Sequence, residues 1–306
     1  MSADMPNVSR VIPNLNRRQA LLGLAACLAA PGFSWAGTSS PRIVCLDYGL
    51  ASTAIGLGVT PVGIASMADW DKWVVEPALA PDIADIGSSW EVNFEIVSAL
   101  KPDLILNTPF GGMLTARLEQ IAPVLTLGAY TADGGDVLPK AVVVTRQLGK
   151  ALGRTQEAEA LIDRAEALFA GCRARLAALD VPPLVLATFM DQRHVQVYSA
   201  PGLFTNVLDR IGIKNAWPRT SSFWGFETVP LERLARVTDP RAKLIALEPF
   251  ATDIGQSLDR SGLWHALPFA RPGQFAVLPG SLMFGMLNDA MRFARILTAH
   301  LEETLS

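Results

Sequence analysis

A long stretch of helical periodicity in the middle of the chain separates two halves of similar pattern. Apolar residues recur at helical spacing over 137–152 and again over 155–179, with Gly153 between the runs and Thr155 placed to cap the second. A helix over 155–179 would be about 35 to 38 Å long, because each residue adds about 1.5 Å. That is the length of a domain, so we predict a helix that links two lobes. The alternative is a helix packed on one face of a single large domain.

Before this stretch, short apolar runs alternate with helical segments. The pattern predicts strands at 43–46, 61–65, 104–106 and 124–127, and helices at 51–58, 93–100 and 113–121. The run at 104–106 is continuously apolar, as in strands that are buried on both faces of a parallel sheet. The first half is therefore predicted to be an α/β lobe.

The same alternation begins again after Pro182 and Pro183. Strands are expected at 184–189, 195–198 and 243–247, and helices at 203–211, 231–237 and 291–301. A weak internal repeat places Glu95 and Glu232 at equivalent positions in the two halves. The predicted fold is α/β, with two Rossmann-like lobes at 37–152 and 181–306 joined by a long linking helix over 153–180.

The first 36 residues have the parts of an export signal in their usual order. Arg17 and Arg18 precede an apolar run over 20–30, and the small-residue triplet 34–36 follows. The run is too short to span a bilayer, and the paired arginines resemble the twin-arginine export motif. We expect a signal peptide over 1–36, cleaved near Ala36, and a periplasmic mature protein. The alternatives are a lipoprotein acylated at Cys27 and an ordinary buried N-terminal helix.

Composition and charge exclude several classes of function. The chain is 50% hydrophobic, enough for a large core, and its 26 Lys and Arg against 29 Asp and Glu give a net charge of −3. No basic stripe follows the N-terminus, so we expect no nucleic-acid partner. The three Cys and three His lack the spacing of a metal site, and we therefore expect neither a metal ligand set nor a cofactor.

Sequence motifs of the common enzyme classes are missing. There is no G-x-S-x-G nucleophile elbow, no phosphate-binding loop and no H-E-x-x-H zinc helix. Asp191 and His194 could act as a base and its orienting partner, but a hydrogen-bonded turn between two strands explains them better. We therefore predict that the protein is not an enzyme, with an exported hydrolase using Asp191 and His194 as an alternative.

Many aromatic residues fall where a predicted strand has just ended. Ligands bind at the carboxyl ends of strands in open α/β sheets, and large flat side chains there suit a bulky, partly apolar ligand. Any one of these residues, taken alone, is better explained as part of the hydrophobic core, but together the group predicts a binding site. Its members are Tyr48, Trp70, Trp73, Trp90, Phe110, Trp217, Phe223, Trp224, Phe226 and Phe284.

A series of short motifs follows along nearly the whole chain. They are WVVEP at 73–77, IG at 86–87, EVNFE at 91–95, KP at 101–102, RH at 193–194, LF at 203–204, GIKNAW at 212–217 and FWG at 223–225. In order and spacing they resemble the periplasmic ferric-hydroxamate siderophore-binding proteins of bacterial ABC importers. The resemblance implies two lobes on a rigid linking helix, a shallow ligand cleft between them, small hinge motion and no catalysis.

The resemblance also assigns roles to individual residues. The aromatic residues of the family's cleft fall on Tyr48, Trp73, Trp217, Trp224 and Phe284. Glu95 and Glu232 fall where these proteins carry one acidic residue on each lobe to meet arginines of the membrane permease. Such a pair would fix the docking register.

Two cleft positions depart from the family pattern. The family's arginine is replaced by Ser89 and its tyrosine by Phe110, while Trp90 adds stacking area. A serine cannot supply the bidentate, charge-assisted bonds of a guanidinium. We therefore expect a related but different ferric siderophore, held more by aromatic contact or by other donors such as Ser88 or Asn107. A hydroxamate is the first candidate.

The resemblance implies two partners, a ferric siderophore and an inner-membrane ABC permease, and we expect a monomer. A haem or cobalamin carrier of the same fold is the alternative within this class. Haem would need an axial ligand in the cleft, and Tyr48 is the candidate for that role.

Overall fold

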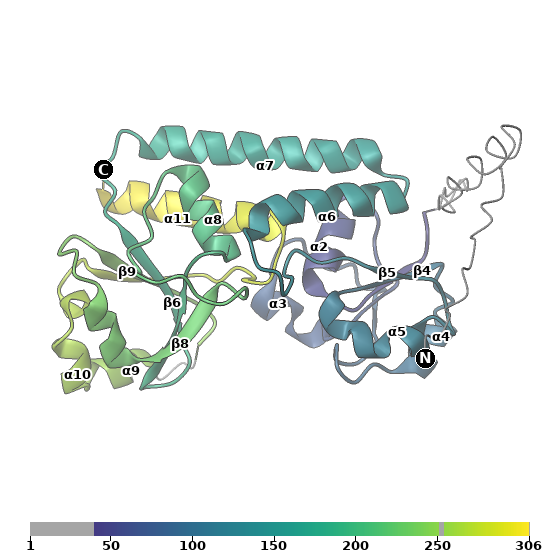
Figure 1. Cartoon of the computed structure of the whole chain (residues 1–306), viewed down its shortest axis with the longest axis horizontal. Coiled ribbons are helices and arrows are strands. Elements are labelled where there is room, and N and C mark those ends of the chain that lie inside the picture. The colour runs from purple at the N-terminus through teal and green to yellow at the C-terminus, as the bar shows by residue number, and fades with distance from the viewer. Residues whose placement is uncertain (1–39, 251–253, 306) are drawn as a thin grey trace, which may run out of the picture. The chain divides into compact units, whose positions relative to one another are not determined.

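Two five-stranded β-sheets are connected by long helices that run alongside both of them (Figure 1). The computed structural model describes residues 40–250 and 254–305. The predicted signal peptide, with Cys27 and the cleavage site near Ala36, lies outside the described residues. All of these described residues belong to one compact unit.

The first sheet has the strand order β3-β2-β1-β4-β5, and all five strands are parallel. Its strands are β1 (Ile43–Cys45), β2 (Gly63–Ile64), β3 (Ala84–Asp85), β4 (Leu104–Asn107) and β5 (Val124–Thr126). The chain winds outward from β1 to β3 and then returns to β4 on the other side of β1. The loops after β1 and β4 therefore diverge, which opens a crevice at the carboxyl edge of the sheet.

Short helices connect these strands. They are α2 (Tyr48–Gly56), η1 (Met67–Asp69), α3 (Trp70–Trp73), α4 (Phe94–Ala99), η2 (Pro109–Leu114) and α5 (Thr115–Leu118). Asn93 caps α4 because its side-chain oxygen accepts the N–H groups of Glu95 and Ile96 at 3.1 Å. The helix predicted over 113–121 is instead a 3-10 turn followed by the short α5.

The second sheet has the order β10-β9-β6-β7-β8 and is mixed. β6 (Leu184–Phe189), β9 (Lys243–Leu247) and β10 (Phe275–Leu278) are parallel, whereas β7 (His194–Tyr198) and β8 (Phe226–Pro230) are antiparallel to their neighbours. The helical segments of this half are α8 (Leu203–Ile211), η3 (Leu231–Arg236), α9 (Ile254–Asp259), α10 (Gly262–His265) and η4 (Pro268–Ala270). Gly212 ends α8 in the left-handed conformation at φ 82°, as its position predicted.

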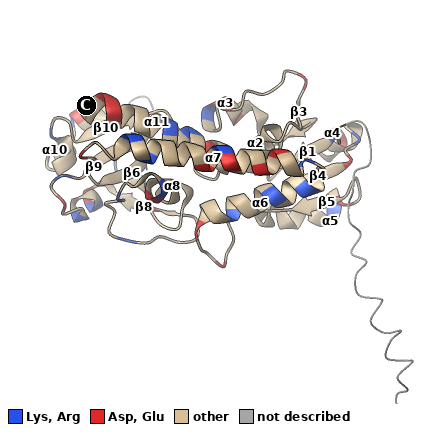
Figure 2. Ribbon diagram, turned by 90° about the horizontal axis from the view of Figure 1, so that it is seen from above, with Lys and Arg blue, Asp and Glu red and all other residues tan. Residues whose placement is uncertain are grey.

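Three long helices join the two halves: α6 (Val137–Ala151), α7 (Thr155–Leu176) and α11 (Leu287–Leu305). α7 packs against α6, α8 and α11, and Figure 1 shows it running past both sheets. Figure 2 shows basic residues along α6 and both acidic and basic residues along α7. The prediction that Thr155 caps α7 is wrong, because Thr155 is the first residue of the helix. The N-cap residue is Arg154, and its side chain makes no capping hydrogen bond. Gly149 allows α6 to approach α7, since a Cβ there would lie 2.5 Å from Cβ of Ala158.

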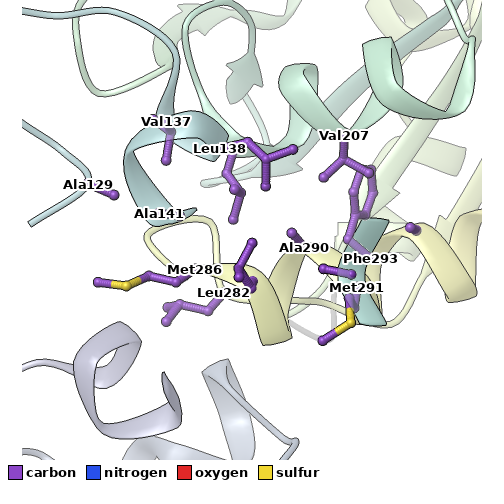
Figure 3. Packing of buried hydrophobic residues seen from close by; sticks show 14 of the residues in the cluster. Ala129, Val137, Leu138, Ala141, Val207, Leu282, Met286, Ala290, Met291 and Phe293 are labelled. Atoms are coloured by element: carbon purple, nitrogen blue, oxygen red, sulfur yellow. The ribbon is translucent and has the colours of Figure 1, made fainter. Parts of the chain in front are cut away.

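One hydrophobic core runs through both halves along these helices. Figure 3 shows its members from different elements: Ala129 after β5, Val137, Leu138 and Ala141 from α6, Val207 from α8, and Ala290 and Phe293 from α11. Two smaller clusters complete the packing around the sheets. α7 therefore links the two sheets and is also part of a core that they share. Among the helices described, none is long and apolar enough to cross a membrane.

Candidate ligand-binding site

A cavity of about 480 Å³ lies where the carboxyl edge of the first sheet meets the second half of the chain. The first half lines it with Leu46, Asp47, Ser89, Trp90, Asn107, Thr108, Phe110, Gly111, Gly128 and Tyr130. The second half contributes Trp224, Phe226, Phe284 and Met286. This volume is within the range of small-molecule sites, and the position is the one expected for a ligand of an open α/β sheet.

Asn107, the last residue of β4, shapes the turn that carries Phe110. Its Nδ2 donates to the carbonyl of Gly111 at 2.9 Å, and its Oδ1 accepts the N–H of Thr108 at 2.9 Å. A Cβ at Gly111 would lie 2.2 Å from that same Oδ1, so the tight turn requires glycine. The turn sets Phe110 into the wall of the cavity.

Aromatic rings from both halves meet at one side of the cavity. We refer to Phe110, Phe223, Trp224, Phe226 and Phe284 as the aromatic wall. The ring centroids of Phe110 and Trp224 are 4.4 Å apart, and those of Trp224 and Phe284 are 5.4 Å apart. Phe223 stacks on Phe110 with an interplanar angle of 3°. The wall is a preformed apolar surface, and ring pairs of this geometry stabilise one another.

Two glycines fix the segment that carries Trp224. Gly225 has φ 76°, and a Cβ on it would lie 2.1 Å from Cα of Gly202. The carbonyl of Gly225 accepts the N–H of Ser199 at 2.9 Å. The backbone beside Trp224 is therefore held against the segment before α8, at a distance that only glycine permits.

The side chains of Asp47, Ser89 and Tyr130, which line the cavity, already have hydrogen-bond partners within the protein. Ser89 Oγ donates to the carbonyl of Leu46 at 2.8 Å, and the Tyr130 hydroxyl donates to the carbonyl of Met283. Burial raises the pKa of Tyr130 well above its usual range. The carboxylate of Asp47 accepts the N–H of Leu50 at 2.9 Å, which caps α2. Burial raises the pKa of Asp47 to about 6, so this side chain is mainly ionised at neutral pH.

A second carboxyl group lies behind the cavity wall. Asp289 is fully buried, and its Oδ2 accepts the N–H of the lining residue Met286 at 3.0 Å. Burial is the main cause that raises its pKa to about 7, and the charge of Asp47 also raises it.

Residues 43–282 match the sequence pattern of the periplasmic binding proteins. The chain belongs to this family. The iron(3+)-hydroxamate-binding protein FhuD of Escherichia coli is 30% identical over 292 residues, which cover 94% of this chain and 96% of that protein. The achromobactin-binding periplasmic protein of Dickeya dadantii is 28% identical over 82% of this chain and 83% of its own length.

Solved structures agree with this relationship. The crystal structure of the Fe³⁺–Desferal-bound siderophore-binding protein FhuD from Vibrio cholerae has a TM-score of 0.82 at 26% identity, covering 88% of this chain and 100% of that chain. FhuD2 of Staphylococcus aureus with bound ferrioxamine B has a TM-score of 0.67 at 17% identity, over 86% of this chain and 99% of that one, which shows a shared fold. The resemblance found in the sequence is thereby confirmed.

Six of the predicted site residues line the cavity of this periplasmic binding protein: Ser89, Trp90, Phe110, Trp224, Phe226 and Phe284. Trp90 is 66% exposed, so it can cover a ligand only from the rim. Ser88, the other predicted donor, does not line the cavity, and its Oγ accepts the N–H of Glu91. Asn107 does line it, but its amide holds the turn before Gly111.

The structure places three other predicted residues away from the cavity. Trp217 is only 5% exposed, lies in the core of the second half and donates from Nε1 to Glu227 at 2.7 Å. Tyr48 donates its hydroxyl to the carbonyl of Ser66, next to the buried Trp70. Trp73 is 37% exposed beside Lys72. None of the three rings lines the cavity described above: Tyr48 and Trp217 are held by partners elsewhere, and Trp73 lies beside its neighbour Lys72.

Asp191 and His194 form a turn between β6 and β7. Oδ1 of Asp191 accepts the N–H groups of Arg193 and His194, and the His194 Nδ1 lies 2.9 Å from Oδ2. These bonds lower the pKa of Asp191. Both side chains are exposed and neither lines the cavity, so the interpretation as a turn fits the geometry.

Over residues 40–250 and 254–305, no three His, Cys, Asp or Glu side chains gather as a metal site. Cys45 and Cys172 are buried and unpaired with each other. Glu95 on α4 and Glu232 on η3 are both exposed.

The lining residues that the sequence analysis missed include Asp47, Tyr130 and Met286. Asp47 could have been found, since it directly follows the predicted strand at 43–46. Nothing local marks Met286, which reaches the cavity because the loop before α11 packs against Gly49.

Proposed function

We propose that this protein is the periplasmic receptor of an iron–siderophore ABC importer and that its cargo is a ferric siderophore, with hydroxamates as the first candidates. The observation that carries the proposal is the aromatic-walled cavity at the carboxyl edge of the first sheet. Support comes from its similarity to FhuD proteins, which are named for iron(3+)-hydroxamate or siderophore binding. The relatives are binding proteins, and this chain is likewise not an enzyme.

The protein would recognise the siderophore mainly through apolar contacts. A chelator that wraps ferric iron presents a bulky surface on which the aromatic wall can pack. The hydroxyl of Ser89 and the amide of Asn107 already donate within the protein, to Leu46 and Gly111. In this reading the iron is cargo, held by its chelator, with no protein atom bound to it.

The proposal is tested by titrating residues 37–306 with ferric chelates while following tryptophan fluorescence. Trp90 and Trp224 line the cavity, so a bound ferric complex should quench their emission. The panel comprises ferric hydroxamates, catecholates and carboxylates, haem and cobalamin, each with its iron-free or metal-free form where one exists. Saturable quenching by a ferric hydroxamate is the expected result. Silence across all ferric chelates would contradict the proposal.

The alternative cargo, haem, finds little support in the cavity. Its candidate axial ligand, Tyr48, is engaged with Ser66 and does not line the cavity. Tyr130 does line it, but its hydroxyl is donated to Met283. An exported hydrolase is disfavoured because Asp191 and His194 build a surface turn.

We also propose that Glu95 and Glu232 dock the receptor onto the permease. Each is exposed on a short helical segment, one in each half of the chain. Acidic side chains placed in this way would steer encounter and fix register more than they add affinity. Glu95→Lys and Glu232→Lys should therefore reduce iron uptake by cells while leaving ligand affinity in solution unchanged. Normal uptake by the double variant would exclude this docking role.

We further propose that the protein is exported through the twin-arginine route and that residues 1–36 are then removed. The mature protein would function as a monomer. Replacing Arg17 and Arg18 by Lys should retain the uncleaved chain inside the cell. Detection of the cleaved protein in the periplasm of that variant would contradict the twin-arginine route. Sedimentation of the mature protein should give a single species of monomer mass.

A further inference from the structure

The cavity contains a marked imbalance of charge. Among the described residues that line it, Asp47 carries a formal negative charge at neutral pH, and no Lys, Arg or His is present. The other polar side chains, Ser89, Asn107, Thr108 and Tyr130, are neutral. A ligand in this cavity would therefore meet a carboxylate and no compensating cation.

The helix ends near the cavity do not offset this charge. The N-terminus of a helix attracts anions through its free N–H groups and its positive dipole end. At α2 this position is already taken, since Asp47 accepts the N–H of Leu50 at 2.9 Å. At α11 the buried Asp289 takes it, accepting the N–H of Met286 at 3.0 Å. At each helix end, a carboxyl group of the protein itself therefore accepts one of these N–H groups.

The positive charge of Arg292, which acts on Asp289, is also neutralised by a nearby acidic side chain. Arg292 lowers the pKa of Asp289, although burial, the largest cause, raises it. The guanidinium of Arg292 donates to Glu76 at 2.5 Å and to the carbonyl of Gly280 at 3.2 Å. Glu76 also binds Arg295. These five groups, Asp47, Asp289, Glu76, Arg292 and Arg295, comprise three acids and two bases, so the region behind the cavity supplies no excess positive charge.

We propose that this cavity selects ferric chelates by net charge: it accepts neutral and cationic complexes and rejects anionic ones, with Asp47 as the residue that determines this specificity. The inference rests on the proposed function and deepens it by naming the class of chelate. Three hydroxamate anions neutralise ferric iron, whereas catecholate and carboxylate chelates keep excess negative charge. Repulsion between such an anion and a partly buried carboxylate weakens binding strongly, because screening by water is reduced there.

The experiment uses three chelates that share one ferric trihydroxamate core and differ only in the charge of the tail. They are ferric desferrioxamine B with its free ammonium group, its N-acetyl derivative, which is neutral, and its N-succinyl derivative, which is anionic. We expect the cation and the neutral complex to bind best and the anion to bind about tenfold or more weakly at low salt. The difference should shrink as salt is added.

Asp47→Asn tests whether this residue is responsible. Asparagine retains a side-chain oxygen that can cap α2, so the fold should persist. The variant should lose most of the discrimination against the anion, measured as the ratio of its affinities for the anionic and the neutral chelate. Asp163→Asn on the exposed face of α7, which does not line the cavity, is the matched control and should keep that discrimination.

Equal affinity of the parent protein for all three chelates would overturn the inference and leave the proposed function standing. Discrimination that persists in Asp47→Asn would likewise overturn the assignment to this residue. If none of the three chelates binds while another class of ligand does, the proposed function itself fails and the inference fails with it. The series on the parent protein is decisive for charge selection even if the variant does not fold.

Discussion

Asp289→Asn should remove a pH-dependent loss of stability that the buried carboxyl group imposes on the folded protein. The side chain is fully buried at the start of α11, and its Oδ1 has no hydrogen-bond partner among the described residues. Burial, assisted by the charge of Asp47, raises its pKa from 3.8 to about 7. Between these two pH values, the carboxyl group of Asp289 therefore keeps its proton in the folded state and loses it in the unfolded chain.

The sign and size of the effect follow from this difference. Below pH of about 4 the carboxyl group is protonated in both states and contributes nothing to the free energy of unfolding. Between about pH 4 and 7 the unfolded chain ionises first, so the free energy of unfolding falls as pH rises. From 3.8 to about 7, at about 1.4 kcal/mol per pKa unit, the ionised side chain costs the folded state roughly 4 kcal/mol above pH 7.

The assay is urea unfolding of the parent protein and of Asp289→Asn between pH 4 and 8, followed by circular dichroism. An asparagine leaves one amide group with no partner, which adds a cost that does not vary with pH. The stability of the variant relative to the parent should therefore increase by up to about 4 kcal/mol from pH 4 to pH 8. Asp163→Asn on the surface of α7 is the control and should show no such trend. A relative stability of Asp289→Asn that stays constant over this range would refute the reasoning.

Three further predictions concern the wall of the cavity and the thiols. Trp224→Ala should weaken ligand binding by about 1 to 3 kcal/mol in calorimetry, because the ring packs on Phe110 and lines the cavity; unchanged affinity would exclude it from the site. Gly225→Ala should lower the free energy of unfolding by about 1 to 3 kcal/mol or more and also weaken binding, since its φ of 76° and its close neighbour leave no room for a Cβ; a variant with parental stability would contradict this. Cys45 and Cys172 should not react with a thiol reagent until the protein is unfolded, since both are buried and burial raises the pKa of Cys45; rapid labelling of the native protein would argue against it.

The elements that could be predicted from the sequence are those with their own strong local pattern. The strand Leu184–Phe189 is wholly buried and apolar except for Thr188, and the helix Leu203–Ile211 ends at a glycine. By contrast, β3 (Ala84–Asp85) and β10 (Phe275–Leu278) escaped prediction. Both lie at sheet edges and exist through their pairing with β2 and β9, which no local pattern records.

The site was predictable where an aromatic side chain lies in a loop next to the end of a strand. Phe110, shortly after β4, and Trp224, shortly before β8, meet that condition and line the cavity. Trp217 has a similar loop context, but its indole finds Glu227 within the second half and is drawn into the core. Whether a tryptophan faces a ligand or the interior depends on such distant partners. Asp47 lay next to a predicted strand, yet its importance emerges only when the rest of the lining is known to lack a base.

The core that α6, α7 and α11 carry through both halves has a consequence for the kinetics of capture. Because the buried side chains of these helices pack against residues of both halves, separating the halves would expose them to water, and we expect the cavity to exist before any ligand arrives. Association should then proceed in a single step. In stopped-flow mixing, the observed rate should increase linearly with ligand concentration, with no plateau from a preceding opening or a following closure.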